Sequence, residues 1–247
     1  MNILIPLLIT FIAGISTIIG IIPTYFNKNE NKIINLSLSF SSGIMISISI
    51  FSLIPESINY LGKISFINII FLLIFINIGL IISTYIDKLI SKRINNNSLY
   101  KLGLTSIIAL VLHNIPEGIT TFLTTSNNLK LGLTLSLAIA LHNIPEGISI
   151  AVPIFYSTNS HKKALFYTFI SGFSELIGGI ISYIFLSHFI NNFILSIILG
   201  ITSGIMLHLS LFELIPSSLK YKNYLNTLIG FILGFIIMII CIFIFKI

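Results

Sequence analysis

The sequence contains little charge: 8% of its 247 residues are charged, whereas 55% are hydrophobic. Soluble domains carry about 25% charged residues, and a soluble fold of this size could not bury so much apolar surface. Disorder is excluded as well, because disordered chains are poor in Ile, Leu and Phe. The mean hydropathy of +1.07 therefore indicates a membrane protein that crosses the bilayer several times.

Cysteine and acidic residues are also scarce. The single cysteine, Cys241, lies in an apolar run, which excludes a disulfide framework and a cysteine-based metal site. The formal net charge is +6, but the basic residues are scattered singly between apolar stretches, so we expect no nucleic-acid partner. The chain has only seven acidic residues, and their positions are therefore informative.

Eight stretches of mostly apolar residues are long enough to cross a bilayer as helices. The expected spans are 3–26, 33–55, 66–86, 102–125, 130–155, 164–188, 193–216 and 225–245. The first is too long for a signal peptide, and none alternates as the strands of a β-barrel do. We therefore expect a single all-α transmembrane domain over 1–247, in contact with lipid and located in the cell (inner) membrane.

Positive charge is distributed unevenly between the two sides that these spans define. Ten basic residues follow odd-numbered spans: Lys28, Lys32, Lys88, Lys92, Arg93, Lys101, Lys162, Lys163, Lys220 and Lys222. Three lie on the opposite side: Lys63, Lys130 and Lys246. Because loops rich in lysine and arginine stay in the cytoplasm, we predict that both termini lie outside it and that the longest loop, 88–101, lies inside.

The chain contains two internal repeats. The segment 42–55 recurs at 203–216, with Ser, Gly, Met, Phe and Pro shared at one offset of 161 residues. The heptapeptide His-Asn-Ile-Pro-Glu-Gly-Ile occurs identically at 113–119 and 142–148. Each pair lies in spans of opposite direction. Inverted repeats with interrupted helices near the membrane midplane are typical of secondary transporters.

Most of the acidic residues lie within or at the ends of the spans, where a charge is costly and indicates function. They are Glu56, Glu117, Glu146, Glu175 and Glu213. In each heptapeptide, His and Glu are four residues apart and share a helical face with Asn beside them. The proline between them frees a carbonyl, at Leu112 or Leu141, and predicts a kink. The following glycine lets another backbone approach closely.

Two such faces in contact would gather two imidazoles, two carboxylates and two amide oxygens, a set that suits zinc, iron or manganese. Without a cation the two glutamates would repel each other, so we expect one or two metal ions with Glu117 and Glu146 as bridges. Glu175 is a further candidate ligand. The candidate ligands are therefore His113, Asn114, Glu117, His142, Asn143, Glu146 and Glu175.

Other polar or soft side chains in the spans are candidates for a transport pathway. They are Met45, Ser52, His208 and Glu213. The methionine is either a soft ligand or core filler, and the serine either lines a pathway or packs closely. His208 and Glu213 are five residues apart, which places them on different faces of an α-helix. Glu56 is interpreted as an interfacial charge, and His161 and His188 as solvated positions.

These motifs resemble those of the ZIP (Zrt/Irt-like) family of divalent-metal transporters, in particular its bacterial GufA/ZupT-type branch. The most specific element is the His-Asn-x-Pro-Glu-Gly motif at 113–118, with its counterpart at 142–147. The Ser-Gly-x-x-Glu element at 171–175 and the stretch 42–56 are also similar to that branch. The resemblance covers essentially the whole chain.

The resemblance implies uptake of zinc, and often of iron, manganese or other divalent ions, through a binuclear centre between spans four, five and six. It implies the ligand set given above, with Met45 and Ser52 at the outer entrance and Glu213 near a metal-interacting position. It also implies a homodimer in which spans one, four, five and six move against the others as an elevator. The histidine-rich loop common in the family is not found here, because 88–101 contains neither His nor acid.

Two other classes of function use similar residues. An intramembrane metallohydrolase would need a motif such as His-Glu-x-x-His, in which the glutamate is the general base, but here Asn follows each His. A proton or anion carrier could use the same acids, yet intramembrane glutamates oppose an anion path and a proton path would not need the paired Asn and Pro. We therefore expect an importer of divalent cations with no catalytic cofactor, and not an enzyme.

Overall fold

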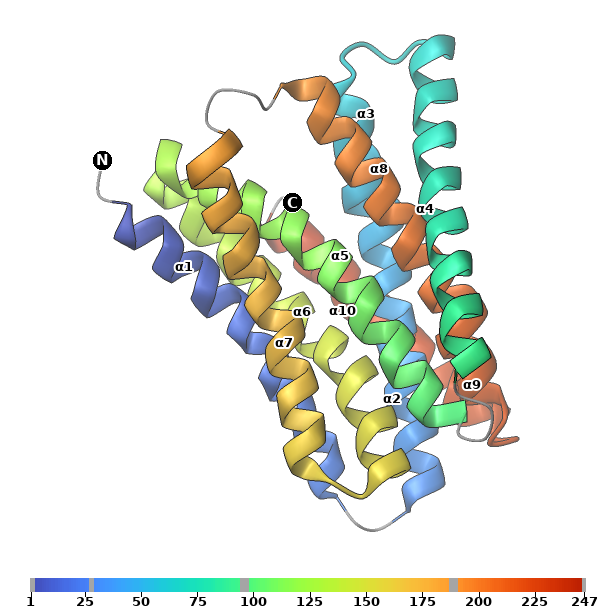
Figure 1. Cartoon of the computed structure of the whole chain (residues 1–247). Coiled ribbons are helices and arrows are strands. Elements are labelled where there is room, and N and C mark those ends of the chain that lie inside the picture. Colours follow the sequence, from blue (N-terminus) through green and yellow to red (C-terminus); the bar gives the residue numbers. More distant parts are fainter. Residues whose placement is uncertain (1–2, 27–28, 94–97, 187–190, 246–247) are drawn as a thin grey trace.

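The computed structural model describes residues 3–26, 29–93, 98–186 and 191–245, where all regular secondary structure is helical (Figure 1). The elements are α1 (Leu4–Ile15), η1 (Ser16–Tyr25), α2 (Glu30–Ile48), η2 (Ser49–Leu53), α3 (Ile54–Tyr60), α4 (Phe66–Arg93), α5 (Ser98–Asn127), α6 (Leu129–Thr158), α7 (His161–Ile181), η3 (Ser182–Leu186), α8 (Asn192–His208), η4 (Leu209–Leu214), α9 (Ile215–Leu219) and α10 (Tyr224–Phe245). Of the short elements, η1 is a 3-10 helix and the other three are π-helices.

Within the described residues, eight helical segments are long and apolar enough to cross a membrane, as predicted. The second, Glu30–Tyr60, is assembled from α2, η2 and α3, and the seventh, Asn192–Leu219, from α8, η4 and α9. The helices α4 and α10 expose large apolar side chains along their lengths, for example Phe66 and Phe243. In a membrane protein such faces contact lipid, so the predicted all-α polytopic fold is confirmed.

The polar stretch 88–101 forms a shorter connection than predicted. The helix α4 continues to Arg93 and α5 begins at Ser98, while 94–97 and His188 lie outside the described residues. Both helices extend into the polar stretch, so polarity alone does not end a helix. An ion pair of 2.6 Å between Asp87 and Lys101 joins the two helix ends.

The π-helical turns lie in helices other than the two whose motif prolines predict a kink. Both α5 and α6 continue as α-helices through Pro116 and Pro145. π-Helical turns occur instead in η2 and η4, which occupy equivalent positions in the repeated segments, each just before a proline. Proline clashes with the carbonyl four residues before it, and a wider turn moves that carbonyl away. The repeated prolines therefore account for the repeated π-helices.

Glycine contacts divide the helices into two groups. The motif group comprises α1, η1, α5, α6 and α7, and the flanking group comprises α2, α3, α4, α8, α9 and α10 with η2 and η4. We asked which atoms a Cβ would meet if it were added to each of the sixteen glycines. In fifteen cases the nearest atoms belong to a helix of the same group. Gly14 of α1 faces Gly172 of α7, and Gly79 of α4 faces Gly204 of α8. Each group is thus held together by close contact between helix backbones, as small residues allow in membranes.

Side chains make several of the contacts between the two groups. The larger apolar core cluster lies here and includes residues of α2, α5, α6 and α8. The Ser41 hydroxyl of α2 donates a hydrogen bond to the Pro145 carbonyl oxygen of α6 at 2.7 Å. The ion pair between Asp87 and Lys101 also joins the groups, because α4 belongs to one and α5 to the other.

Candidate metal centre

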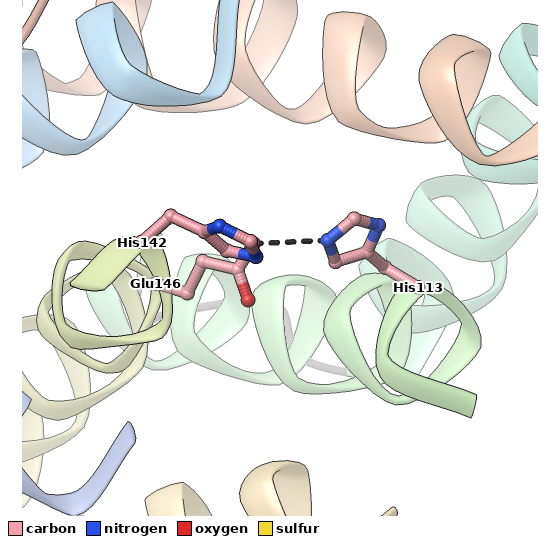
Figure 2. Close-up of side chains that lie close together, drawn as sticks. All are labelled: His113, His142 and Glu146. Atoms are coloured by element: carbon pink, nitrogen blue, oxygen red, sulfur yellow. Dashed lines mark ion pairs between the residues drawn. The ribbon is translucent and has the colours of Figure 1, made fainter. Parts of the chain in front are cut away.

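The two copies of the heptapeptide face each other where α5 and α6 pack together. His113 Nε2 lies 3.0 Å from Glu117 Oε1 in the same helix and 3.1 Å from Glu146 Oε1 of α6. His142 Nε2 lies 2.9 Å from Glu117 Oε1. Figure 2 shows the imidazoles of His113 and His142 directed toward one another from the two helices, with the Glu146 carboxylate beside them. The structure therefore brings both motif faces into one cluster.

The geometry of this cluster is suitable for a metal ion. One ligand atom each of His113, His142 and Glu146 lies within 4.8 Å of the other two. Metal–ligand bonds to imidazole nitrogen and carboxylate oxygen are about 2.0–2.2 Å long, so two ligands on opposite sides of one ion lie about 4 Å apart. All three side chains are buried in the bundle, so little bulk water would reach an ion bound among them.

The two asparagines direct their carbonyl oxygens away from protein partners. Asn114 Nδ2 donates to the Ser171 carbonyl oxygen of α7 at 2.9 Å. Asn143 Nδ2 donates to the Ala13 carbonyl oxygen of α1 at 3.0 Å and to Glu175 Oε2 at 2.9 Å. Each amide nitrogen thus bonds a neighbouring helix, while each amide oxygen is left without a hydrogen-bond partner. These oxygens remain available to a cation.

The candidate ligands hold an unusual number of unpaired polar atoms. Nine buried nitrogen and oxygen atoms of the seven side chains have no hydrogen-bond partner, although two of them, His113 Nε2 and Glu146 Oε1, form an ion pair of 3.1 Å with each other. Leaving one such atom unpaired costs about 1–3 kcal/mol, and more when the group is charged. Three carboxylates gathered in one buried site also repel each other. A divalent cation would remove both penalties, so the donor set fits a metal.

Glycine brings the third helix of the site into reach. A Cβ on Gly118 of α5 would overlap the backbone of Glu175 in α7, and a Cβ on Gly147 of α6 would overlap that of Thr17 in η1. Only glycine permits such an approach, so α7 can place Glu175 beside Asn143. The glycine of each heptapeptide therefore positions a helix, while His, Asn and Glu supply the polar atoms.

Two of the predicted pathway residues, Met45 and Ser52, lie in different surroundings. Ser52 borders a small cavity that reaches Glu117 and His142. Met45 is fully buried in the apolar core cluster between the groups, where it packs as a core residue. Of the two interpretations left open for methionine, the structure supports core filler.

The prediction that His208 and Glu213 lie on different faces is wrong. His208 Nδ1 lies 2.9 Å from Ser83 Oγ of α4. The Glu213 carboxyl group forms a hydrogen bond with that of Asp87, one turn further along α4. The π-helix η4 separates the two residues, and its i→i+5 pattern brings positions five apart onto one side. Both residues therefore face α4, away from the heptapeptide cluster.

Three other residues differ from their sequence interpretation. Glu56, interpreted as an interfacial charge, borders the same cavity as Glu117. His161, expected to be solvated in a loop, is the first residue of α7 and stacks against Tyr25 with ring centroids 4.3 Å apart. Asp87 was not singled out by any motif, and its ion pair with Lys101 and its proximity to Glu213 are visible only in the structure.

Comparison with known proteins agrees with this arrangement. The family model described as ZIP Zinc transporter matches residues 97–242, which include both heptapeptides and Glu175. The chain is 35% identical to the zinc transporter ZupT of Clostridium perfringens, over 99% of this chain and 97% of that protein. The chain belongs to the ZIP family. The resemblance predicted from the motifs is therefore confirmed.

Other ZIP relatives are similar over comparable lengths. The chain is 33% identical to the zinc transporter ZupT of Streptococcus mutans, with 96% of each protein covered. It is 32% identical to the zinc transporter ZupT of Campylobacter jejuni, over 96% of this chain and 95% of that one. The similarity to ZIP proteins thus extends to the flanking group as well as to the helices that carry the heptapeptides.

Proposed function

We propose that this ZIP-family chain is a secondary transporter that imports divalent cations into the cytoplasm, with zinc as the main cargo and iron or manganese as further ones. The observation that carries the proposal is the buried cluster of His113, His142 and Glu146, whose ligand atoms converge within 4.8 Å of one another. The relatives named zinc transporters support zinc as cargo. Without a His-Glu-x-x-His motif to supply a general base, the site suits binding and release better than hydrolysis.

The seven candidate ligands would have different roles in binding the ion. Glu117 contacts both histidines, so its carboxylate is placed to bridge the two sides of the site. Asn143 orients Glu175 through its amide nitrogen and offers its oxygen to the metal. Imidazole, carboxylate and amide oxygen together replace the water that a divalent ion loses on binding, and one or two ions could be held.

Transport would proceed by movement of the motif group relative to the flanking group. The candidate ligands all belong to α5, α6 and α7, so the site would move with the motif group as one body. The cavity beside Glu117 and His142 shares three lining residues with a larger cavity at the end of the bundle where α5 connects to α6. With both termini outside the cytoplasm, as the lysine and arginine count predicts, this end faces outward. We also propose a homodimer in the cell (inner) membrane.

The first test is uptake of radioactive zinc, iron and manganese by metal-starved cells that express the protein. The test variant is the double substitution Glu117→Ala and Glu146→Ala, at equal abundance in the membrane. The matched control is Glu30→Ala, which removes an exposed carboxylate at the start of α2. Saturable uptake by the wild type and the control, lost in the double variant, is the expected result.

Other outcomes separate the parts of the proposal. No uptake above that of empty cells, with the protein correctly inserted, would refute the transporter function. Uptake that survives the double substitution would preserve transport but refute the proposed site. The order of the three rates would rank the cargo ions, which an N/O ligand set does not determine by itself.

A further inference from the structure

Two adjoining cavities connect the outer end of the bundle to the candidate metal centre. The larger has a volume of about 420 Å³ and lies among helix ends, between α3, the end of α5 and the start of α6. The smaller, of about 40 Å³, is bordered by Glu117 and His142. Three residues border both: Ser52, Glu56 and Leu135. An ion that moves from the larger cavity to the centre therefore passes these three side chains.

Glu56 is the charged member of this set. It is partly buried in the first turn of α3, directly after the π-helix η2, and Tyr60 follows it by one turn of the same helix. Within the described residues, no lysine or arginine forms an ion pair with it. A carboxylate without a positive partner in a narrow cleft concentrates cations there, because the low-dielectric walls focus its field.

We infer that Glu56 is the capture residue of the transporter: its carboxylate binds the incoming divalent ion in the outer cavity and passes it to Glu117 and His142. This inference rests on the proposed function. A single carboxylate with water as the other ligand holds a divalent ion loosely, whereas the buried centre offers several donors at once. The ion would therefore move inward toward more protein ligands.

The experiment measures the initial rate of radioactive zinc uptake over a range of zinc concentrations, at low and high ionic strength. For Glu56→Gln we expect KM to rise about threefold or more and to lose most of its dependence on ionic strength, with the maximal rate kept within about twofold. Tyr60→Phe, the matched control, removes a neighbouring hydroxyl group and keeps the charge, so its KM stays unchanged. Glu56→Asp restores much of the lost affinity.

A gain-of-charge variant keeps the test decisive if Glu56→Gln fails to reach the membrane. Asn59 is exposed and borders the larger cavity, so Asn59→Asp adds a second carboxylate there and should lower KM at low ionic strength. An unchanged KM in Glu56→Gln, or in Asn59→Asp when the first variant is not inserted, would overturn the inference. The same follows if Tyr60→Phe matches Glu56→Gln, because the carboxylate would then be structural. Absence of uptake by the wild type would instead refute the proposed function, and the inference with it.

Discussion

Replacing Gly118 by alanine tests whether the metal centre depends on direct contact between α5 and α7. A Cβ at this position would overlap the carbonyl oxygen of Glu175 and lie 2.7 Å from its carbonyl carbon. Non-bonded carbons prefer separations of about 3.5–4.0 Å, so the two backbones must move apart by about 1 Å. Overpacking of this kind costs about 1–3 kcal/mol. In a chain of this length, that lowers the unfolding temperature by a few degrees.

The same displacement would disturb the proposed ligand set. Glu175 Oε2 accepts a hydrogen bond of 2.9 Å from Asn143, and a shift of α7 breaks it. Metal–ligand distances vary by only about 0.2 Å, so a carboxylate displaced by about 1 Å no longer coordinates. Loss of a supporting partner lowers metal affinity about 10–100-fold, and we expect the KM for zinc uptake to rise by a factor in this range.

The matched control is Gly179→Ala in α7, the helix that Gly118 of α5 approaches. A Cβ there would lie 3.4 Å from Leu7 Cδ2 and from Thr10 Cγ2, which is ordinary contact with flexible side chains. Both substitutions raise intrinsic helix propensity by about 1 kcal/mol, so propensity alone predicts two equally stabilised proteins. Thermal unfolding of the purified protein and zinc uptake kinetics distinguish the cases. Equal unfolding temperatures and equal KM values in the two variants would refute the reasoning.

Three further substitutions probe other contacts. Asn143→Leu removes the donor that orients Glu175 and should raise the zinc KM about tenfold or more, as measured by uptake; an unchanged KM would contradict its supporting role. Lys101→Gln should lower the free energy of unfolding by up to about 1 kcal/mol, and the charge swap of Lys101→Asp with Asp87→Lys should recover part of it in thermal melts. His161→Ala should cost about 0.5–1.5 kcal/mol of stability through lost stacking, with zinc uptake unaltered; slower uptake would mean that this ring also has a transport role.

The number of spans and the meeting of the two heptapeptides were predictable from the sequence. Span length follows from bilayer thickness, and an identical motif in two adjacent spans can pair across one interface. The position of the π-helical turns was not predictable, because the sequence alone does not distinguish Pro116 and Pro145, which lie in continuous α-helices, from Pro55 and Pro216, which follow π-helices. Whether proline widens a helix depends on how neighbouring helices support the backbone, which is tertiary information.

The roles of individual charges were harder to predict. Glu56 near a span end has the same sequence signature whether it faces lipid headgroups or a cavity, and only packing distinguishes the two. Glu213 was assigned a face on the assumption of an α-helix, and the π-helix η4 invalidates that assumption. Asp87 directly follows the predicted span 66–86, and Lys101 ends the predicted loop 88–101. In the structure both lie in helices and contact each other.

The segregation of glycine contacts has a mechanical consequence. Where two backbones touch directly, no rotatable bond lies between them, so strain in one helix passes to the next without being absorbed. Where side chains meet, rotamer changes can take up small displacements at low cost. The motif group and the flanking group are therefore two rigid groups of helices, and the interface between them is more easily deformed. The motion that costs least energy is sliding of one group relative to the other. This property belongs to the protein before any ion binds.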